Sequence, residues 1–185
     1  MNQNKTLGQH VFSYFARLFA LDIGSFLMSG IVLAQWDYST LRCILQILSF
    51  ILLVSMTYSY IHKVGFSDSA LVNSGIAAPQ RLKGLTIGCI ANIPFFITAI
   101  ALILARFGII SSKFYGYYTL LNSFFFPFLS TVLPSDMLIT EVHTGDFIMA
   151  VAVQIIIPLL AMFSYLVGLS QFSFKEAVFY KKISD

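Results

Sequence analysis

Two stretches of this chain are long, apolar and without formal charge: residues 85–105, with 21 residues, and residues 147–169, with 23. A helix needs about 20 apolar residues to cross a hydrocarbon core about 30 Å thick. Residues 18–34 and 41–61 are two further apolar stretches of similar length, charged only near their ends. A single apolar segment satisfies its backbone in lipid only as a helix. The pattern predicts an all-α, polytopic integral membrane bundle with four full crossings.

The composition predicts a single membrane-embedded domain over residues 1–185. Hydrophobic residues make up 58% of the chain and charged residues only 10%, against roughly a quarter charged in soluble proteins. The longest polar intervals, residues 62–84 and 134–146, are too short for a separate soluble domain. The first is rich in Gly, Ser, Asn and Pro, a composition that predicts a loop.

The charge and cysteine patterns exclude several classes of function. The net charge of +3 comes from scattered Lys and Arg, so we expect the lipid bilayer and no nucleic acid as a partner. Cys43 and Cys89 lie near the starts of consecutive crossings, which run in opposite directions, so a disulfide between them is not expected. The chain has no CxxC pattern, P-loop or dinucleotide fingerprint, and we therefore expect no cofactor and no metal site.

Residues 117–133 form a fifth apolar segment, which is ambiguous. It has only 17 residues and carries Pro127 inside an aromatic run. Short cytoplasmic loops collect Lys and Arg. If the segment does not cross, eight basic residues lie inside and three outside; if it crosses, the division is five to six. We expect four crossings in the plasma membrane, both termini cytoplasmic, and a re-entrant or interfacial element on the outer side. Five crossings is the alternative.

The C-terminal tail carries its own pattern at residues 173–182. Ser173 and Glu176 fit a capping box, and the residues that follow mix apolar and basic side chains. The pattern predicts a short amphipathic helix on an anionic inner leaflet. A frayed tail is the alternative.

Three polar side chains near the middle of the crossings are the candidate site: Asp22, Asn92 and Gln154. An aspartate at the centre of a membrane helix costs about 2.5–3.5 kcal/mol on insertion scales, and intramembrane acids often line pathways. Arg17 is five residues away, which places its side chain about 140° around the helix from that of Asp22. Asp22 therefore needs a donor on another helix, water in a cavity, or a proton.

Two prolines and two glycines also mark these crossings. Pro94 and Pro158 each interrupt a helix and deprive the carbonyl four residues earlier of its usual donor. Gly84 and Gly88 form a GxxxG pattern, which predicts close helix packing. Because four crossings enclose little space, we expect a homo-oligomer or a partner membrane protein that docks on this glycine face.

Three classes of function remain open. Interrupted helices with polar groups at mid-depth are typical of transporters, so the first is a transport or channel-like component, alone or as a membrane subunit of a larger assembly. The second is a non-catalytic scaffold whose polar residues only hold helices together. The third, weaker one is a membrane enzyme that uses the outer loop, although the loop matches no metal signature and we assign no catalytic residue. The loop residues with suitable side chains are Asp136, Glu141, His143 and Asp146.

Overall fold

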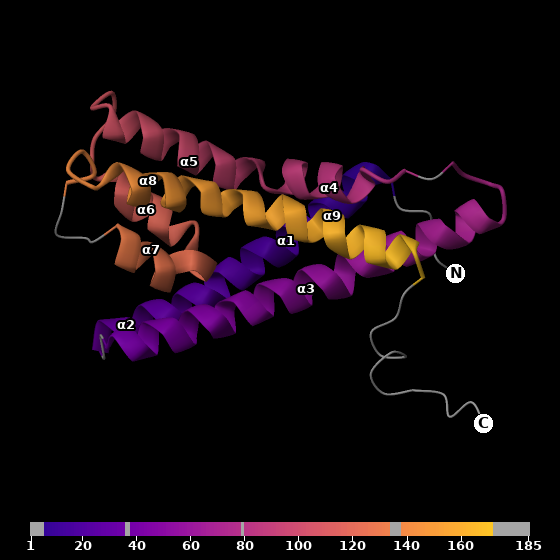
Figure 1. The fold of residues 1–185 in the computed structure, drawn as a ribbon, viewed down its shortest axis with the longest axis horizontal. Helices are drawn as coiled ribbons and strands as arrows, with labels where there is room; N and C mark the ends of the chain where they lie inside the picture. Colours follow the sequence, from indigo (N-terminus) through magenta and orange to yellow (C-terminus); the bar gives the residue numbers. More distant parts are fainter. Residues whose placement is uncertain (1–5, 36–37, 79, 134–137, 172–185) are drawn as a thin grey trace.

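The computed structural model describes residues 6–35, 38–78, 80–133 and 138–171, and all of its regular structure there is helical (Figure 1). A π turn and a 3-10 turn interrupt two of the long helical stretches. The elements are α1 (Leu7–Ser25), η1 (Phe26–Gly30, a π turn), α2 (Ile31–Gln35), α3 (Ser39–Asn73), α4 (Lys83–Ala91), α5 (Ile93–Arg106), α6 (Phe114–Leu120), η2 (Ser123–Phe125, a 3-10 turn), α7 (Phe126–Val132), α8 (Thr144–Ala152), η3 (Val153–Ile155, a 3-10 turn) and α9 (Ile156–Leu169).

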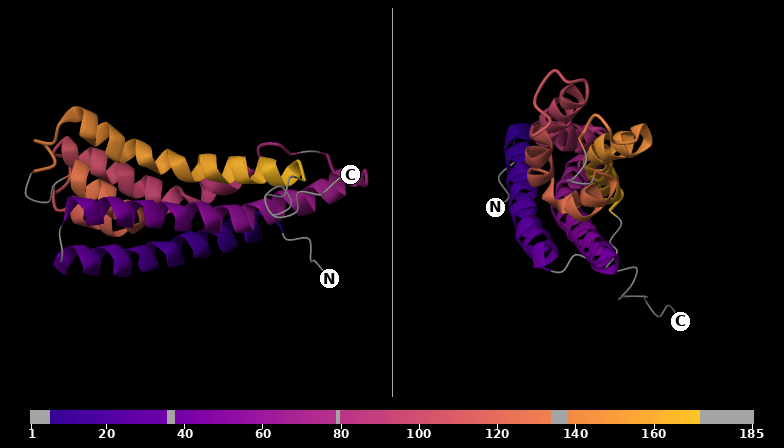
Figure 2. Two further views of the ribbon diagram at one scale, coloured as in Figure 1. Left: turned by 60° about the horizontal axis from the view of Figure 1, so that its bottom comes forward. Right: turned by 90° about the vertical axis from the view of Figure 1, so that its left-hand side faces the viewer.

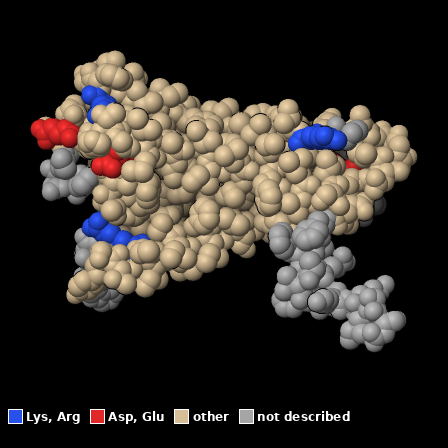
Figure 3. Space-filling view, viewed as in Figure 1, with Lys and Arg blue, Asp and Glu red and all other residues tan. Residues whose placement is uncertain are grey.

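Three continuous helical stretches are long and apolar enough to cross a membrane: Leu7–Ala34, Ser39–Asn73 and Thr144–Leu169. A fourth is the pair Lys83–Ala91 and Ile93–Arg106, if these two helices, bent by 56°, are taken as one span. Charged side chains gather at the two ends of the face seen in Figure 3, and the surface between them carries none. Both observations fit a membrane location.

α1 and α3 both extend beyond the crossings that the sequence predicts. α1 begins at Leu7 because Thr6 and Gln9 form a capping box, in which each side chain bonds the other residue's backbone N–H. α3 continues to Asn73, so the loop expected from residue 62 is wrong over its first half. Gly65 serves there as a packing contact and not as a turn, because a Cβ added to it would lie 2.3 Å from the carbonyl oxygen of Tyr165. Tertiary contact outweighs the turn-forming composition.

The aromatic segment forms a hairpin, α6–η2–α7. It starts and finishes at the end of the bundle where α3 begins, and its turn, η2, points toward the middle of the molecule (Figures 1 and 2). We call this the hairpin end and the other the opposite end, where α1 begins and α9 finishes. The segment does not run the length of the bundle.

Glycines bring α3, α4 and α9 into close contact. A Cβ on Gly84 would lie 2.3 Å from the Cβ of Tyr165, and one on Gly88 would lie 2.8 Å from the Cα of Pro158. Gly168 approaches α3 in the same way, with its added Cβ 2.2 Å from the carbonyl oxygen of His62. We call these contacts the glycine seam. The GxxxG pattern therefore packs inside the chain, and the expectation that this face meets a second copy is wrong. The predicted tail helix at residues 173–182 lies outside the described residues.

Candidate functional site

Four interruptions of the helices meet inside the bundle. They are the π turn after α1, the break between α4 and α5 at Asn92, the turn between α6 and η2 at Asn122, and the 3-10 turn that holds Gln154. Hydrogen bonds join the last three to one another, and Asp22, in α1 one turn before the π turn, binds the start of η2 next to Asn122. We call the group of side chains that makes these bonds the polar junction. Its members are Asp22, Asn92, Thr98, Tyr118, Asn122 and Gln154.

Asn92 replaces the hydrogen bond that Pro158 removes. Pro158 has no N–H to donate to the carbonyl of Gln154, four residues earlier. The side-chain amide of Asn92 donates to that carbonyl oxygen at 3.1 Å, and both Asn92 and Gln154 are buried. Pro94 lies in the first turn of α5, just after the bend. The structure thus brings together Asn92, Gln154 and Pro158, while Pro94 is exposed.

Asn122 extends the junction into the hairpin. The amide nitrogen of Gln154 donates to Asn122 Oδ1 at 2.6 Å and to the hydroxyl of Tyr118 at 3.2 Å. Asn122 Nδ2 in turn donates to Thr98 Oγ1 at 3.2 Å and to the carbonyl of Tyr118 at 2.8 Å. The hydroxyl of Tyr118 donates to the carbonyl of Ala150 at 2.5 Å. These contacts tie α5, α6 and α8 together.

Asp22 holds the tip of the hairpin. Its carboxylate is 3% exposed and accepts the backbone N–H of Ser123 at 2.6 Å, with the N–H of Phe124 as a second donor. These N–H groups open η2 and have no partner within that turn. A carboxylate is well matched to them, because charge-assisted hydrogen bonds are the stronger ones. Asp22 therefore finds its donor on another element, and that donor is backbone.

The rest of the hairpin is held by α3. Gln46 Oε1 accepts the N–H of Phe128 at 3.0 Å, in the first turn of α7, and Arg42 donates to the carbonyl of Ser130 at 3.4 Å. The hydroxyl of Tyr115 donates to the carbonyl of Leu133, which joins the two ends of the hairpin. Burial raises the pKa of Tyr115 to about 12, with Arg42 acting in the opposite direction, so the phenol stays protonated at neutral pH.

Five buried polar atoms find no hydrogen-bond partner among the described residues. They are the hydroxyls of three serines and the side-chain carbonyls of two amides: Ser25, Ser29, Ser49, Asn92 and Gln154. Ser25, Ser29 and Ser49 are at most 1% exposed. Buried polar groups are costly to leave unpaired, and water is their usual partner where no protein group serves.

The described residues of the loop before α8 do not come together as a metal site. Glu141 is exposed, and His143 uses Nδ1 to accept the N–H of Gly145 at the start of α8. Arg106 binds this loop through the carbonyl of Val142 at 2.8 Å and stacks over the ring of Phe147. No group of three metal-binding side chains occurs in the part of the chain that the structure describes, which leaves out Asp136.

The sequence prediction missed three members of the junction: Thr98, Tyr118 and Asn122. Asn122 carried a readable signal, because it is a polar amide inside an apolar segment. The partners of Asp22 left no such signal, since they are backbone groups.

Comparison with known proteins gives no match to a family model, to a curated protein or to a solved structure. The class of protein is therefore defined by the fold alone, as an all-helical bundle with three to four helices able to cross a membrane.

Proposed function

We propose that the chain crosses the membrane four times, with the bent pair α4–α5 as the third crossing and the hairpin entering from the outer side. The return of the hairpin to its own end supports this topology. Lys63, Arg81 and Lys83 lie toward the opposite end, which would face the cytoplasm together with both termini. In a cysteine-free background in intact cells, Lys113→Cys should react with an impermeant maleimide and Arg81→Cys should not. The reverse pattern would overturn the proposed orientation.

We propose that the protein is a transport or channel-like component of the plasma membrane. The observation that carries this is the meeting of three helix interruptions, at Asn92, Asn122 and Gln154, through buried polar side chains, with Asp22, one turn before the π turn, bound to the hairpin tip beside them. Discontinuous helices with polar groups at mid-depth are how many transporters build their sites, and π turns are frequent at functional sites. Asp22, Asn92 and Gln154 would be the polar lining, with Asp22 as its ionisable member.

A membrane scaffold is the second candidate. The side-chain amides of Asn92, Asn122 and Gln154 all donate to groups of the same chain. Such bonds between helices also serve as glue, worth about 1 kcal/mol each. A scaffold would bind a second copy or another membrane protein through its exposed apolar surface, because the glycine seam is already filled. Light scattering of the purified protein in detergent would measure the number of copies.

Flux in proteoliposomes separates the two candidates. The purified protein is reconstituted into vesicles that hold an ion-sensitive dye. A pH-sensitive dye follows H⁺ movement, and dyes for Na⁺ and K⁺ follow those ions, each under an imposed gradient. We expect a flux above that of empty vesicles, and Asp22→Asn should abolish it while the protein still assembles. Asp146→Asn, at the start of α8, is the matched control and should keep the flux. Absence of flux for every ion would favour the scaffold. Unchanged flux in Asp22→Asn would remove Asp22 from the pathway.

A further inference from the structure

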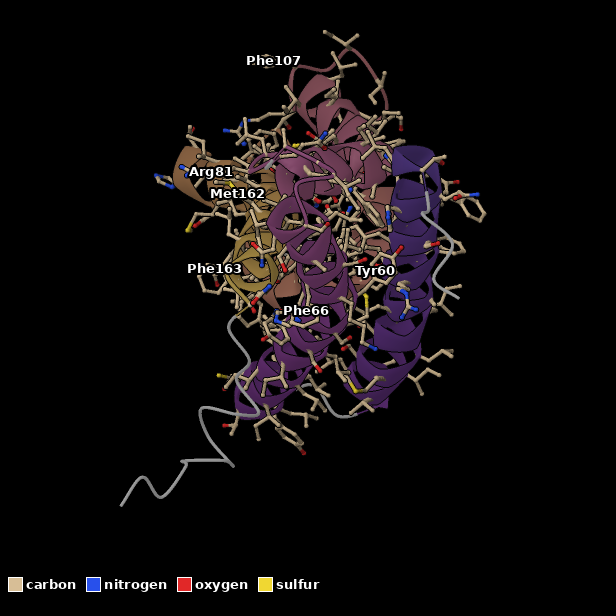
Figure 4. All side chains as sticks on the ribbon, turned by 90° about the vertical axis from the view of Figure 1, so that its right-hand side faces the viewer. Tyr60, Phe66, Arg81, Phe107, Met162 and Phe163 are labelled. Atoms are coloured by element: carbon tan, nitrogen blue, oxygen red, sulfur yellow. The ribbon has the colours of Figure 1, made fainter. Side chains whose placement is uncertain are left out.

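α1 and α3 run antiparallel, and polar groups line the interface between them. Near the opposite end, His10 Nδ1 and the hydroxyl of Tyr60 are 3.3 Å apart, and the hydroxyls of Tyr14 and Thr57 are 3.0 Å apart. Figure 4, which looks from that end, shows Tyr60 between the two helices. These pairs fix the register, because both helices rise 1.5 Å per residue.

The same register sets the order of groups toward the hairpin end. Asp22 is level with Ser49, and Ser25 is level with Gln46. Ser29 lies one turn further out. Ser25 lies within about 60° of Asp22 around α1 by the 100° step per residue, Ser29 lies in the π turn that follows, and all three are buried. The hydroxyls of Ser25, Ser29 and Ser49 are the unpartnered ones. Three unsatisfied hydroxyls thus surround the approach to one carboxylate.

An apolar layer closes the interface between α1 and α3 on the side of Asp22 that faces the opposite end. Leu18 and Leu53 are level with each other by the same register, and both are fully buried. They separate Asp22 from the Tyr14–Thr57 pair, one turn further along. The row of polar groups is therefore interrupted once.

A groove of about 610 Å³ lies between α3 and α7, beside the outer end of the row. Polar groups of α3 and residues of the hairpin line it together. Among them are Ser39, Arg42, Gln46, Pro127, Phe128 and Thr131. Gln46 is shared, because it lines the groove and is level with Ser25.

We propose that this row of polar groups is a water-lined half-pathway that carries protons from the outer groove, past Ser29 and then Gln46 and Ser25, to Asp22. It rests on the proposed function and names the proton as the transported species. Hydroxyls suit this role because each can both donate and accept a hydrogen bond. A hydronium ion would pass its proton to a carboxylate oxygen of Asp22, leaving water behind and a neutral acid in place.

Few charged groups act on that carboxylate. α3 faces Asp22 with Ser49, and η2 faces it with backbone N–H groups. Arg42 is seven residues from Ser49, which is about 10 Å of helix rise. Arg17, on the same helix as Asp22, lies over the ring of Tyr60. The carboxylate thus has no described charged partner at its own level, so protonation neutralises it without breaking an ion pair.

Cysteine accessibility tests the pathway without any need for flux. In a Cys43→Ser, Cys89→Ser background, single variants Ser25→Cys, Ser29→Cys and Ser49→Cys are treated in intact cells with a small cationic methanethiosulfonate. The reagent reacts with thiolate, which forms only where water reaches. We expect all three to be modified, and Leu53→Cys and Thr57→Cys to be protected from the outside. Ser55→Cys is the control for the exposed face of α3, because Ser55 is exposed and lies between Leu53 and Thr57 in depth, and it should stay unmodified.

Protection of all three serine positions would overturn the pathway even if the protein conducts. Modification of Leu53→Cys or Thr57→Cys from outside would overturn the apolar layer. Modification of Ser55→Cys would show that labelling does not report the interface between α1 and α3. The three reporters lie on two helices, so one variant that fails to assemble leaves the test intact. Labelling without any flux would count against the proposed transport function and leave the water-lined row in place. A flux of Na⁺ or K⁺ but not of H⁺ would overturn the proton as the species.

Discussion

The glycine seam and the polar junction hold neighbouring parts of the bundle by opposite means. In the glycine seam, α9 touches α4 and α3 through glycines, with no room for a single added methyl group at Gly84 or Gly168. In the polar junction, helices are broken and polar side chains bond backbone groups, while the side-chain carbonyls of Asn92 and Gln154 find no partner among the described residues. Close packing specifies one rigid arrangement. A junction held by a few polar contacts is the part of this fold where a second arrangement costs least.

The largest effect is expected in the seam. Gly168→Ala would place a Cβ 2.2 Å from the carbonyl oxygen of His62, an atom of the backbone that cannot move alone. We expect a loss of about 3 kcal/mol in the free energy of unfolding, at the upper end of overpacking effects. Denaturation by SDS in mixed micelles measures it.

Gly24→Ala is the matched control for the seam, because nothing lies within 4 Å of its added Cβ. Alanine is favoured over glycine inside a helix by up to about 1 kcal/mol, so this variant should be as stable as the parent or more so. Equal stability of Gly168→Ala and Gly24→Ala would contradict the close contact between α3 and α9.

An intermediate effect is expected at the hairpin tip. Asp22→Leu removes the acceptor of the Ser123 N–H and leaves a buried donor unpaired, at a cost of about 2 kcal/mol. Asp22→Asn keeps an acceptor oxygen and should cost less than about 1 kcal/mol. Hydrogen exchange of the Ser123 and Phe124 amides locates the change, since both should exchange faster in Asp22→Leu. Unchanged exchange would mean that the tip is held by other contacts.

The smallest effect is expected at Asn92. Asn92→Ala leaves the carbonyl of Gln154 without a donor, which should cost about 1 kcal/mol. In a Pro158→Ala background the alanine supplies an N–H four residues after Gln154, so the same change should cost less. A double-mutant cycle measures this coupling. Equal costs in both backgrounds would show that Asn92 does not replace the missing helical bond.

The long apolar helices could be predicted from length and charge, because the cost of burying charge in lipid leaves a direct mark on the sequence. The stretches at residues 85–105 and 147–169 both fall within helical elements. The start of α1 was also readable, since Thr6 and Gln9 carry the capping-box pattern. The extension of α3 to Asn73 was not, because Gly65 fits a turn as well as a close packing contact and only the position of α9 decides between them.

Part of the candidate site could also be predicted from the sequence, and part could not. Asp22, Asn92 and Gln154 stand out as polar residues at mid-crossing, and the structure joins Asn92 directly to Gln154. Asp22 reaches them only through the hairpin, by way of Ser123 and its neighbour Asn122. A bond to a backbone N–H leaves no trace in residue identity, so this link could not be read from the sequence. The homo-oligomer and the proton pathway stay predictions.

The attachment of the hairpin also has a consequence for biosynthesis. Asp22 and Gln46, which bond the starts of η2 and α7, precede the hairpin in the chain, whereas Gln154 follows it. A ribosome therefore makes the two acceptors before the segment that needs them, so both partners of the short apolar hairpin are already synthesised when it emerges. The last helix then closes the assembly by bonding both Asn122 and Asn92.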